Sequence, residues 1–193
     1  MRWDNLVADL EGQLDHAEVA ERAAEIEEHA RAESGRLSLV DRLRGAQGES
    51  LRVEVSRSGR GEAAAGWSVR GRLARVGDGW LLIAGESGAE TVVMLASVTA
   101  VYGLSRLSAA PGSMTAVEAR LSVRSVLRSI ARDRAAVRVR TRHGVVIEGT
   151  IDRVGADFFE VATHSVGELR RSALVRELAV VAVDGVAAVE RLP

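Results

Sequence analysis

The hydrophobic positions of this chain form blocks that occur twice, in the same order. The matched pairs of blocks are residues 36–44 with 120–128, 71–84 with 149–162, and 92–101 with 180–189. Each pair shares five identical residues, and the offset between the copies changes from 84 to 78 to 88 residues. Turn-like and polar segments absorb these changes, as expected of two folded units with loops of different length. The pattern therefore predicts a duplicated folding unit.

Each copy begins with a helical pattern. In the second copy, residues 115–118 (Thr-Ala-Val-Glu) form a capping box, and apolar residues follow at near-helical spacing. These apolar residues are Leu121, Val123, Val126, Leu127 and Ile130. Arg120, Arg124 and Arg128 lie four residues apart on another face of the same predicted helix.

Short strands follow the helix in each copy. Alternation of valine and arginine over residues 136–140 predicts a strand with one apolar and one basic face. Turn signals at residues 143–144 and 155–157 divide the strands that come next. Gly71 and Gly149 occupy matching positions, where a glycine lets a sheet bend sharply. A helix followed by several short strands predicts a small, strongly bent antiparallel barrel.

Residues 4–34 form a predicted long helix with a dense acidic face. Its apolar stripe begins with Trp3, Val7, Leu10 and Leu14, at alternating steps of four and three residues, and then fades to alanines. A helix with so weak a stripe rarely folds alone. We therefore expect it to pack on a barrel or to pair with another helix, and the four named residues are the candidate helix interface.

Composition limits the chemistry of the chain. Hydrophobic residues make up 47% and aromatic residues 3%, so the cores are expected to be aliphatic. The chain has no cysteine, which excludes disulfides, thiol catalysis and thiolate metal sites. The first residues lack the apolar core of a signal peptide, and the longest apolar stretch, residues 91–104, is too short to cross a bilayer. We expect a cytoplasmic protein without a membrane partner.

The charge is unevenly distributed, although the net charge is −1. Residues 1–35 carry ten acids against three arginines, and residues 120–153 carry nine arginines against three acids. All 26 basic residues are arginine, which we attribute to codon bias rather than to a site. The candidate nucleic-acid or partner face consists of Arg120, Arg124, Arg128, Arg138, Arg140 and Arg142. Contact with phosphates is one interpretation of this face; a solvated face, or a counter-surface for the acidic helix, is the other.

Catalytic signatures are missing from the sequence. It contains no nucleophile elbow, phosphate-binding loop or dinucleotide-binding glycine pattern. His16 and His29 are thirteen residues apart on the predicted helix, too far along its axis to share an ion. His143 lies at a hairpin turn, where a solvated histidine is common. We therefore expect no catalytic residue, no cofactor, no metal ion and no small-molecule substrate.

Residues 143–162 (HGVVIEGTIDRVGADFFEVA) resemble the first motif of the Sm-like family, small barrels that include bacterial RNA chaperones and splicing-ring proteins. The matching features are Gly144, Gly149 five residues later, and Ile151 two residues beyond it. The overall layout also resembles tandem-barrel proteins of actinobacteria. In RNA-binding members the final turn carries polar or basic residues that hold a base and its phosphate. The matching turns here, residues 95–98 and 183–186, contain no aromatic, histidine or cationic residue.

The predicted fold is mainly β with helices: two tandem Sm-like or SH3-like small antiparallel β-barrels, each preceded by a helix, and a long N-terminal helix. The predicted domains are residues 1–35, 36–107 and 108–193. Open strand edges of such barrels pair with neighbours unless they are covered, and the two copies can satisfy one edge against each other. The leading hypothesis is a non-catalytic adaptor or assembly module that acts through protein–protein contacts or self-association. The alternative is an Sm-like RNA-binding protein that uses the arginine face of the second copy.

Overall fold

The computed structural model describes residues 16, 19, 21–56, 66–86, 88–112, 121–164 and 177–192. The chain divides into two compact units, Met1–Leu39 and Val40–Pro193. In the first unit, residues 21–34 form a helix that is exposed at every position, with an ion pair of 2.8 Å between Arg31 and Glu27. The predicted interface of Trp3, Val7, Leu10 and Leu14 lies outside the described residues.

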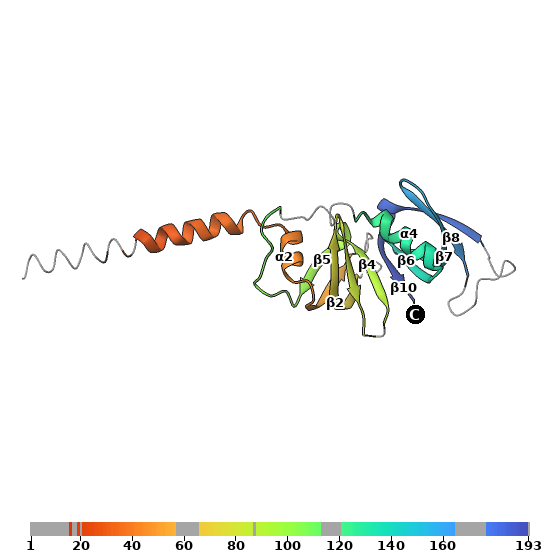
Figure 1. Cartoon of the computed structure of the whole chain (residues 1–193), viewed down its shortest axis with the longest axis horizontal. Helices are drawn as coiled ribbons and strands as arrows, with labels where there is room; N and C mark the ends of the chain where they lie inside the picture. The colour runs from red at the N-terminus through yellow and green to blue at the C-terminus, as the bar shows by residue number, and fades with distance from the viewer. Residues whose placement is uncertain are drawn as a thin grey trace, which may run out of the picture. The chain divides into compact units, whose positions relative to one another are not determined.

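Two helices and ten strands lie among the described residues of the second unit (Figure 1). Its first half comprises α2 (Leu39–Gly45), β1 (Ser50–Val55), β2 (Trp67–Gly77), β3 (Trp80–Ala84), β4 (Glu90–Met94) and β5 (Val98–Tyr102). Its second half comprises α4 (Val123–Asp133), β6 (Ala136–Thr141), β7 (Val146–Val154), β8 (Phe158–Thr163), β9 (Glu177–Ala182) and β10 (Val186–Arg191). A single 3₁₀ turn joins the last two strands of each half, at Leu95–Ser97 and Val183–Gly185.

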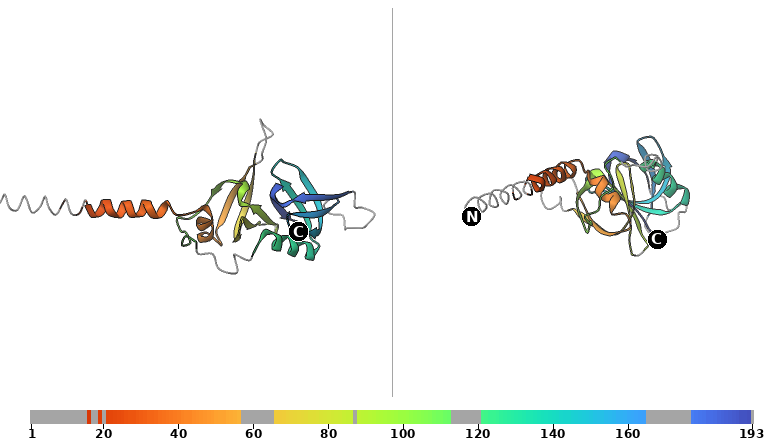
Figure 2. Two further views of the ribbon diagram at one scale, coloured as in Figure 1. Left: turned by 90° about the horizontal axis from the view of Figure 1, so that it is seen from above. Right: turned by 60° about the vertical axis from the view of Figure 1, so that its left-hand side comes forward.

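All ten strands belong to one open antiparallel sheet, in the order β5-β1-β2-β3-β4-β10-β6-β7-β8-β9. The prediction of two separate small barrels is therefore wrong. The reason is that β4 and β10 pair along their lengths, from Ala188 opposite Val93 to Arg191 opposite Glu90. This pairing joins the last strand of the second half to the first half, as the views in Figure 2 also show. The domain boundaries proposed from the sequence remain a prediction.

The two halves have the same strand order. The first half runs β5-β1-β2-β3-β4 across the sheet, and the second half runs β10-β6-β7-β8-β9. Gly71 and Gly149 have the same role in each half, because a Cβ at either position would collide with the carbonyl oxygen of Ala84 or Ala162 on the next strand. A side chain at these positions would push β2 from β3, or β7 from β8. The bends predicted at these two glycines are thus close approaches of neighbouring backbones.

Two hydrophobic cores lie on this sheet. The first core gathers Leu43 of α2 with buried residues of β1 to β4, and the second core gathers Leu127 of α4 with buried residues of β6 to β10. On β4, Val93 belongs to the first core, whereas Val92 and Met94 belong to the second. Because successive side chains of a strand point to opposite faces, the cores lie on opposite faces of the sheet where they meet. The apolar runs at residues 80–84, 92–94 and 186–189 of β3, β4 and β10 fit strands that are covered on both faces.

Helix α4 begins later than the sequence predicts. Its N-cap is Ser122, whose hydroxyl accepts a hydrogen bond from the backbone N–H of Ser125. Leu121 is not helical, because its carbonyl oxygen accepts a hydrogen bond from the indole of Trp80 instead of starting the helix. The predicted capping box at residues 115–118 lies outside the described residues. A tertiary contact from the other half of the sheet therefore fixes how the chain enters this helix.

Candidate functional site

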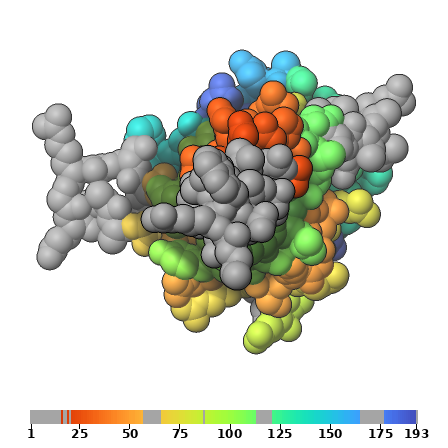
Figure 3. Space-filling view, turned by 90° about the vertical axis from the view of Figure 1, so that its left-hand side faces the viewer, coloured from red at the N-terminus to blue at the C-terminus, as the bar shows by residue number. Residues whose placement is uncertain are grey.

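The sheet leaves two edges, β5 and β9, each with one neighbouring strand among the strands that the structure describes. Each is the counterpart of a strand that is paired in the other half: β5 corresponds to β10, and β9 corresponds to β4. Figure 3 views the molecule from the side on which β5 lies in Figure 1, and green atoms of the segment following β5 are exposed there. Unpaired N–H and C=O groups along a strand edge favour pairing with another strand.

The pairing of β4 with β10, called the inner junction below, shows how each kind of edge is buried when another strand pairs with it. Val92 and Met94 of β4 are 2% and 6% exposed, because the second core packs against them. Val92 matches Val180 of β9 at the repeat offset of 88 residues, and Val180 is 64% exposed. Leu178, two residues earlier on β9, is 51% exposed. The free edge thus exposes a valine that its counterpart buries, and it carries an exposed leucine where its counterpart has Glu90.

The β5 edge shows the same difference. Ala188 of β10 is 1% exposed and packs in the first core, across the junction from its own half. Its match on β5, Ala100, is half-buried, and Tyr102 at the end of β5 is 50% exposed. Each edge therefore carries one residue whose counterpart is buried at the β4–β10 junction, Ala100 on β5 and Val180 on β9.

Trp80 fastens the inner junction. Its ring belongs to β3 in the first half but packs in the second core, and its Nε1–H donates a hydrogen bond of 2.8 Å to the carbonyl oxygen of Leu121. Phe158 occupies the matching position in the second half. Trp80 is 2% exposed, whereas Phe158 is half-buried on β8 beside the free β9 edge. The matching ring lies next to the unpaired edge.

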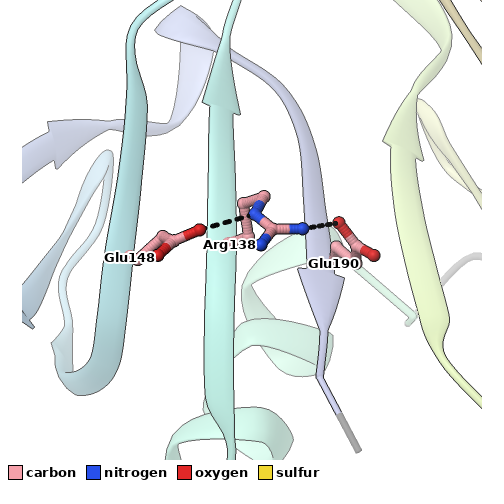
Figure 4. Close-up of polar contacts among 3 residues, drawn as sticks. All are labelled: Arg138, Glu148 and Glu190. Carbon is pink, nitrogen blue, oxygen red and sulfur yellow. Dashed lines mark hydrogen bonds and ion pairs between the residues drawn. The ribbon is translucent and has the colours of Figure 1, made fainter. Parts of the chain in front are cut away.

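Arg138 is neutralised within the sheet (Figure 4). It stands on β6 between Glu148 of β7 and Glu190 of β10, which lie directly opposite it in the two ladders. Its Nε donates to Glu148 at 2.7 Å, and another guanidinium nitrogen donates to Glu190 at 3.3 Å. The hydrogen bond to Glu148 raises the pKa of Arg138 above its ordinary value, although burial opposes this shift. Two carboxylates already occupy this guanidinium, so little of its charge is left for a ligand.

The other predicted arginines do not form one surface with Arg138. Arg124 and Arg128 are on α4, which packs through Leu127 on the face of the sheet that carries the second core. Val137 and Val139 face that same core, so the alternating arginines of β6 point to the opposite face. Arg140 stacks on Trp67, with its guanidinium carbon 4.9 Å from the ring centre, and Arg124 donates to the carbonyl of Ala156. Arg142 has a buried Nε without a hydrogen-bond partner. Arg120 lies outside the described residues.

The described residues contain no group of three or more histidines and carboxylates arranged to hold a metal ion, and no helix long and apolar enough to cross a bilayer. His164 is buried, and its Nε2 lies 2.8 Å from the hydroxyl of Thr150 in a hydrogen bond. This contact ties the end of β8 to β7.

No family model, no curated protein and no solved structure matches this chain. The resemblance to the Sm-like family therefore stays a prediction.

The sequence analysis missed the β9 edge and the position of Trp80 at the junction. A signal for both exists in the sequence. In residues 80–83 and 92–94, the alternate positions that should face solvent are apolar, which indicates burial on both faces of the strand. The residues of β9 that match 92–94, residues 180–182 (Val-Val-Ala), are also apolar.

Proposed function

We propose that this protein is a non-catalytic assembly module that binds copies of itself head to tail, by pairing β5 of one molecule with β9 of the next. The β4–β10 junction inside the chain carries this proposal, because it is a working example of the same contact. The two free edges are the matching strands, and they have the same antiparallel polarity. Assembly would bury the aliphatic side chains that now face solvent on β9.

The internal junction also sets the register of the proposed contact. Ala188 lies opposite Val93, Val189 opposite Val92, and Glu190 opposite Thr91. Shifting each residue by the repeat offset of 88 gives the pairs between molecules. These pairs are Ala100 with Val181, Val101 with Val180, and Tyr102 with Ala179. In this register Ala100 and Val180 each face the core of the neighbouring molecule, as Ala188 and Val92 do within the chain.

The contact between molecules would differ from the internal one in its polar details. Phe158 has no N–H to replace the hydrogen bond that Trp80 gives to Leu121. The ion pair between Arg191 and Glu90, 3.7 Å long, has Gly103 and Leu178 at the matching positions. We therefore expect the contact between molecules to be weaker than the internal junction and to depend on protein concentration. Because the contact joins two different surfaces, repetition gives a closed ring or an open filament.

Two blocked variants test the proposal. Val180→Lys places a charge on the β9 edge, and Ala100→Lys places one on the β5 edge, where lysine opposes strand pairing. Light scattering on the full chain is expected to show concentration-dependent oligomers for the native protein and monomers for each variant. A mixture of the two variants is expected to form a 1:1 dimer, since each retains the edge that the other has lost.

Val145→Lys is the matched control. Val145 is 55% exposed and precedes β7, away from both edges, so this variant is expected to assemble like the native protein. A native chain that stays monomeric at every concentration would overturn the proposal. A dimer formed by Ala100→Lys alone would also overturn it, because that result indicates a symmetric contact between two β9 edges.

The nucleic-acid alternative has less support. Arg138 is paired with two carboxylates, and the arginines of α4 lie on the opposite face of the sheet from those of β6. The continuous positive face on which that alternative depends is therefore divided.

A further inference from the structure

A broad groove in the second unit includes Thr91 of β4 and Glu190 of β10, which pair with each other across the inner junction. It has a volume of about 1290 Å³ and is lined by ends of β1 to β5 together with Arg140 and Glu190 of the second half. This volume exceeds the ~300–1,000 Å³ that is typical of small-molecule pockets, and the groove is open along one side. Four arginines and two aromatic residues give it its chemical character: Arg52, Arg70, Arg72, Arg140, Trp67 and Tyr102.

Three of these arginines are neighbours on one face of the sheet. Arg52 of β1 lies directly opposite Arg70 of β2 in the ladder, and Arg72 follows two residues later on the same strand. Like charges placed directly opposite each other in a sheet are destabilising. No ion pair to Arg70 or Arg72 is found among the described residues, and both side chains are exposed. An anion held between these guanidiniums would remove that repulsion.

Two guanidiniums of the groove are oriented by aromatic rings. The guanidinium carbon of Arg52 lies 4.2 Å from the ring centre of Tyr102, and that of Arg140 lies 4.9 Å from the ring centre of Trp67. Stacking on a ring fixes the plane of a guanidinium and leaves its N–H edge available to a partner. The Nε atoms of both arginines are buried without a hydrogen-bond partner. Both guanidiniums therefore have N–H groups that the described residues leave unsatisfied.

The carboxylates near the groove do not cancel its charge. Glu86 and Glu190 line it, but Glu190 is bound to Arg138, which lies outside the lining. Glu54 Oε1 lies 3.3 Å from Arg52 Nε, within ion-pair distance but without hydrogen-bond geometry. Glu54 therefore offsets the charge of Arg52 in part, and Glu86 is the one lining carboxylate without an ion pair to an arginine among the described residues. The groove is suited to a ligand with more than one negative group.

We propose that this groove binds a small ligand that carries a chain of two or more phosphate groups. The guanidinium fork matches phosphate oxygens in a bidentate manner, and adjacent phosphates present oxygens to Arg52, Arg70 and Arg72 together. The exposed ring of Tyr102 offers a stacking surface at one end of the same site. A free polyphosphate and a nucleoside polyphosphate share this chemistry, and the second would also use the ring. Tyr102 also lies in the proposed β5 contact between molecules, so the site is tested on a chain that cannot assemble.

Calorimetric titration of the full-length Val180→Lys chain tests the site, because blocking the β9 edge separates ligand binding from assembly. The probes are inorganic tripolyphosphate, ATP, and citrate as a carboxylate of comparable charge. Tripolyphosphate is expected to bind, and ATP to bind at least as tightly. If ATP binds more tightly than tripolyphosphate, the ligand is a nucleotide. If the two bind equally, the site recognises the phosphate chain alone. Citrate binding as tight as that of tripolyphosphate would overturn the phosphate assignment.

The decisive variant is Arg70→Gln with Arg72→Gln. Each lost charged hydrogen bond is expected to weaken binding by about tenfold, so the double variant should bind about a hundredfold more weakly. Arg128→Gln with Arg132→Gln is the matched control, since it removes the same charge from exposed positions of α4 outside the groove. Equal losses in the two double variants would mean that net charge alone attracts the probe, and the site would be refuted. An unchanged melting temperature for both variants verifies that folding is intact.

Discussion

Trp80→Phe tests whether the two halves of the sheet fold as one structure. Trp80 is a residue of the first half whose ring is buried in the second core, with 2% of its surface exposed. The substitution keeps an aromatic ring, removes the hydrogen bond to Leu121, and leaves part of the ring volume unfilled. Phe158 at the matching position indicates that phenylalanine fits this site in the fold.

The expected loss of stability follows from these two changes. A hydrogen bond of this kind contributes about 1 kcal/mol net, and the half-buried carbonyl left behind can be partly hydrated. Truncation of a buried tryptophan to alanine costs ~3–5 kcal/mol, so the smaller change to phenylalanine is expected to cost about 1 kcal/mol in packing. The total is about 2 kcal/mol, which corresponds to a decrease in melting temperature of roughly 4–8 °C for a chain of this size.

Urea unfolding followed by both circular dichroism and tryptophan fluorescence is the appropriate assay. We expect one transition, coincident in the two signals, which moves as a whole to lower urea in the variant. Trp67→Phe is the control, because Trp67 is half-buried at the start of β2, packs against the first core and keeps with phenylalanine a ring for Arg140 to stack on. We expect it to cost less than about 1 kcal/mol. Two separate transitions, with only one displaced by Trp80→Phe, would refute the idea that the second core depends on a residue of the first half.

Two other substitutions test local features of the sheet. Gly149→Ala is expected to lower the free energy of unfolding by about 1–3 kcal/mol, because the new Cβ would collide with the backbone of Ala162. Gly185→Ala is the control: no atom lies within 4 Å of its new Cβ, so the melting temperature should change little. Arg138→Gln is expected to lower the free energy of unfolding by about 1–2 kcal/mol, measured by thermal unfolding, because it leaves two carboxylates facing each other across β6. Adding Glu148→Gln should recover part of this stability. No recovery would contradict the ion-pair account.

The helices and strands of each half were largely predictable from the repeated blocks that begin at residues 36–44 and 120–128. Such patterns predict elements that form within a short stretch of chain. The alternation of residues 136–140 predicted the inward valines and outward arginines of β6. The matching glycines 71 and 149 predicted a bend in the sheet, whereas the close approach of Gly149 to the backbone of Ala162 came only from the structure. The arginine face was not predictable in this way, because Glu148 and Glu190, which pair with Arg138, reach it only through strand pairing.

The sequence by itself determined the repeated blocks, the strands within each half and the polarity of their faces, since each of these depends on neighbours a few residues away. Only the tertiary structure decided that β4 pairs with β10, and with it that one open sheet replaces two barrels. Main-chain hydrogen bonds between strand edges are nearly the same for every sequence, so the choice of partner depends on which side chains the pairing buries. Here the side chains of β4 bury themselves in both cores at once, and that gain is available only when the two halves share a sheet.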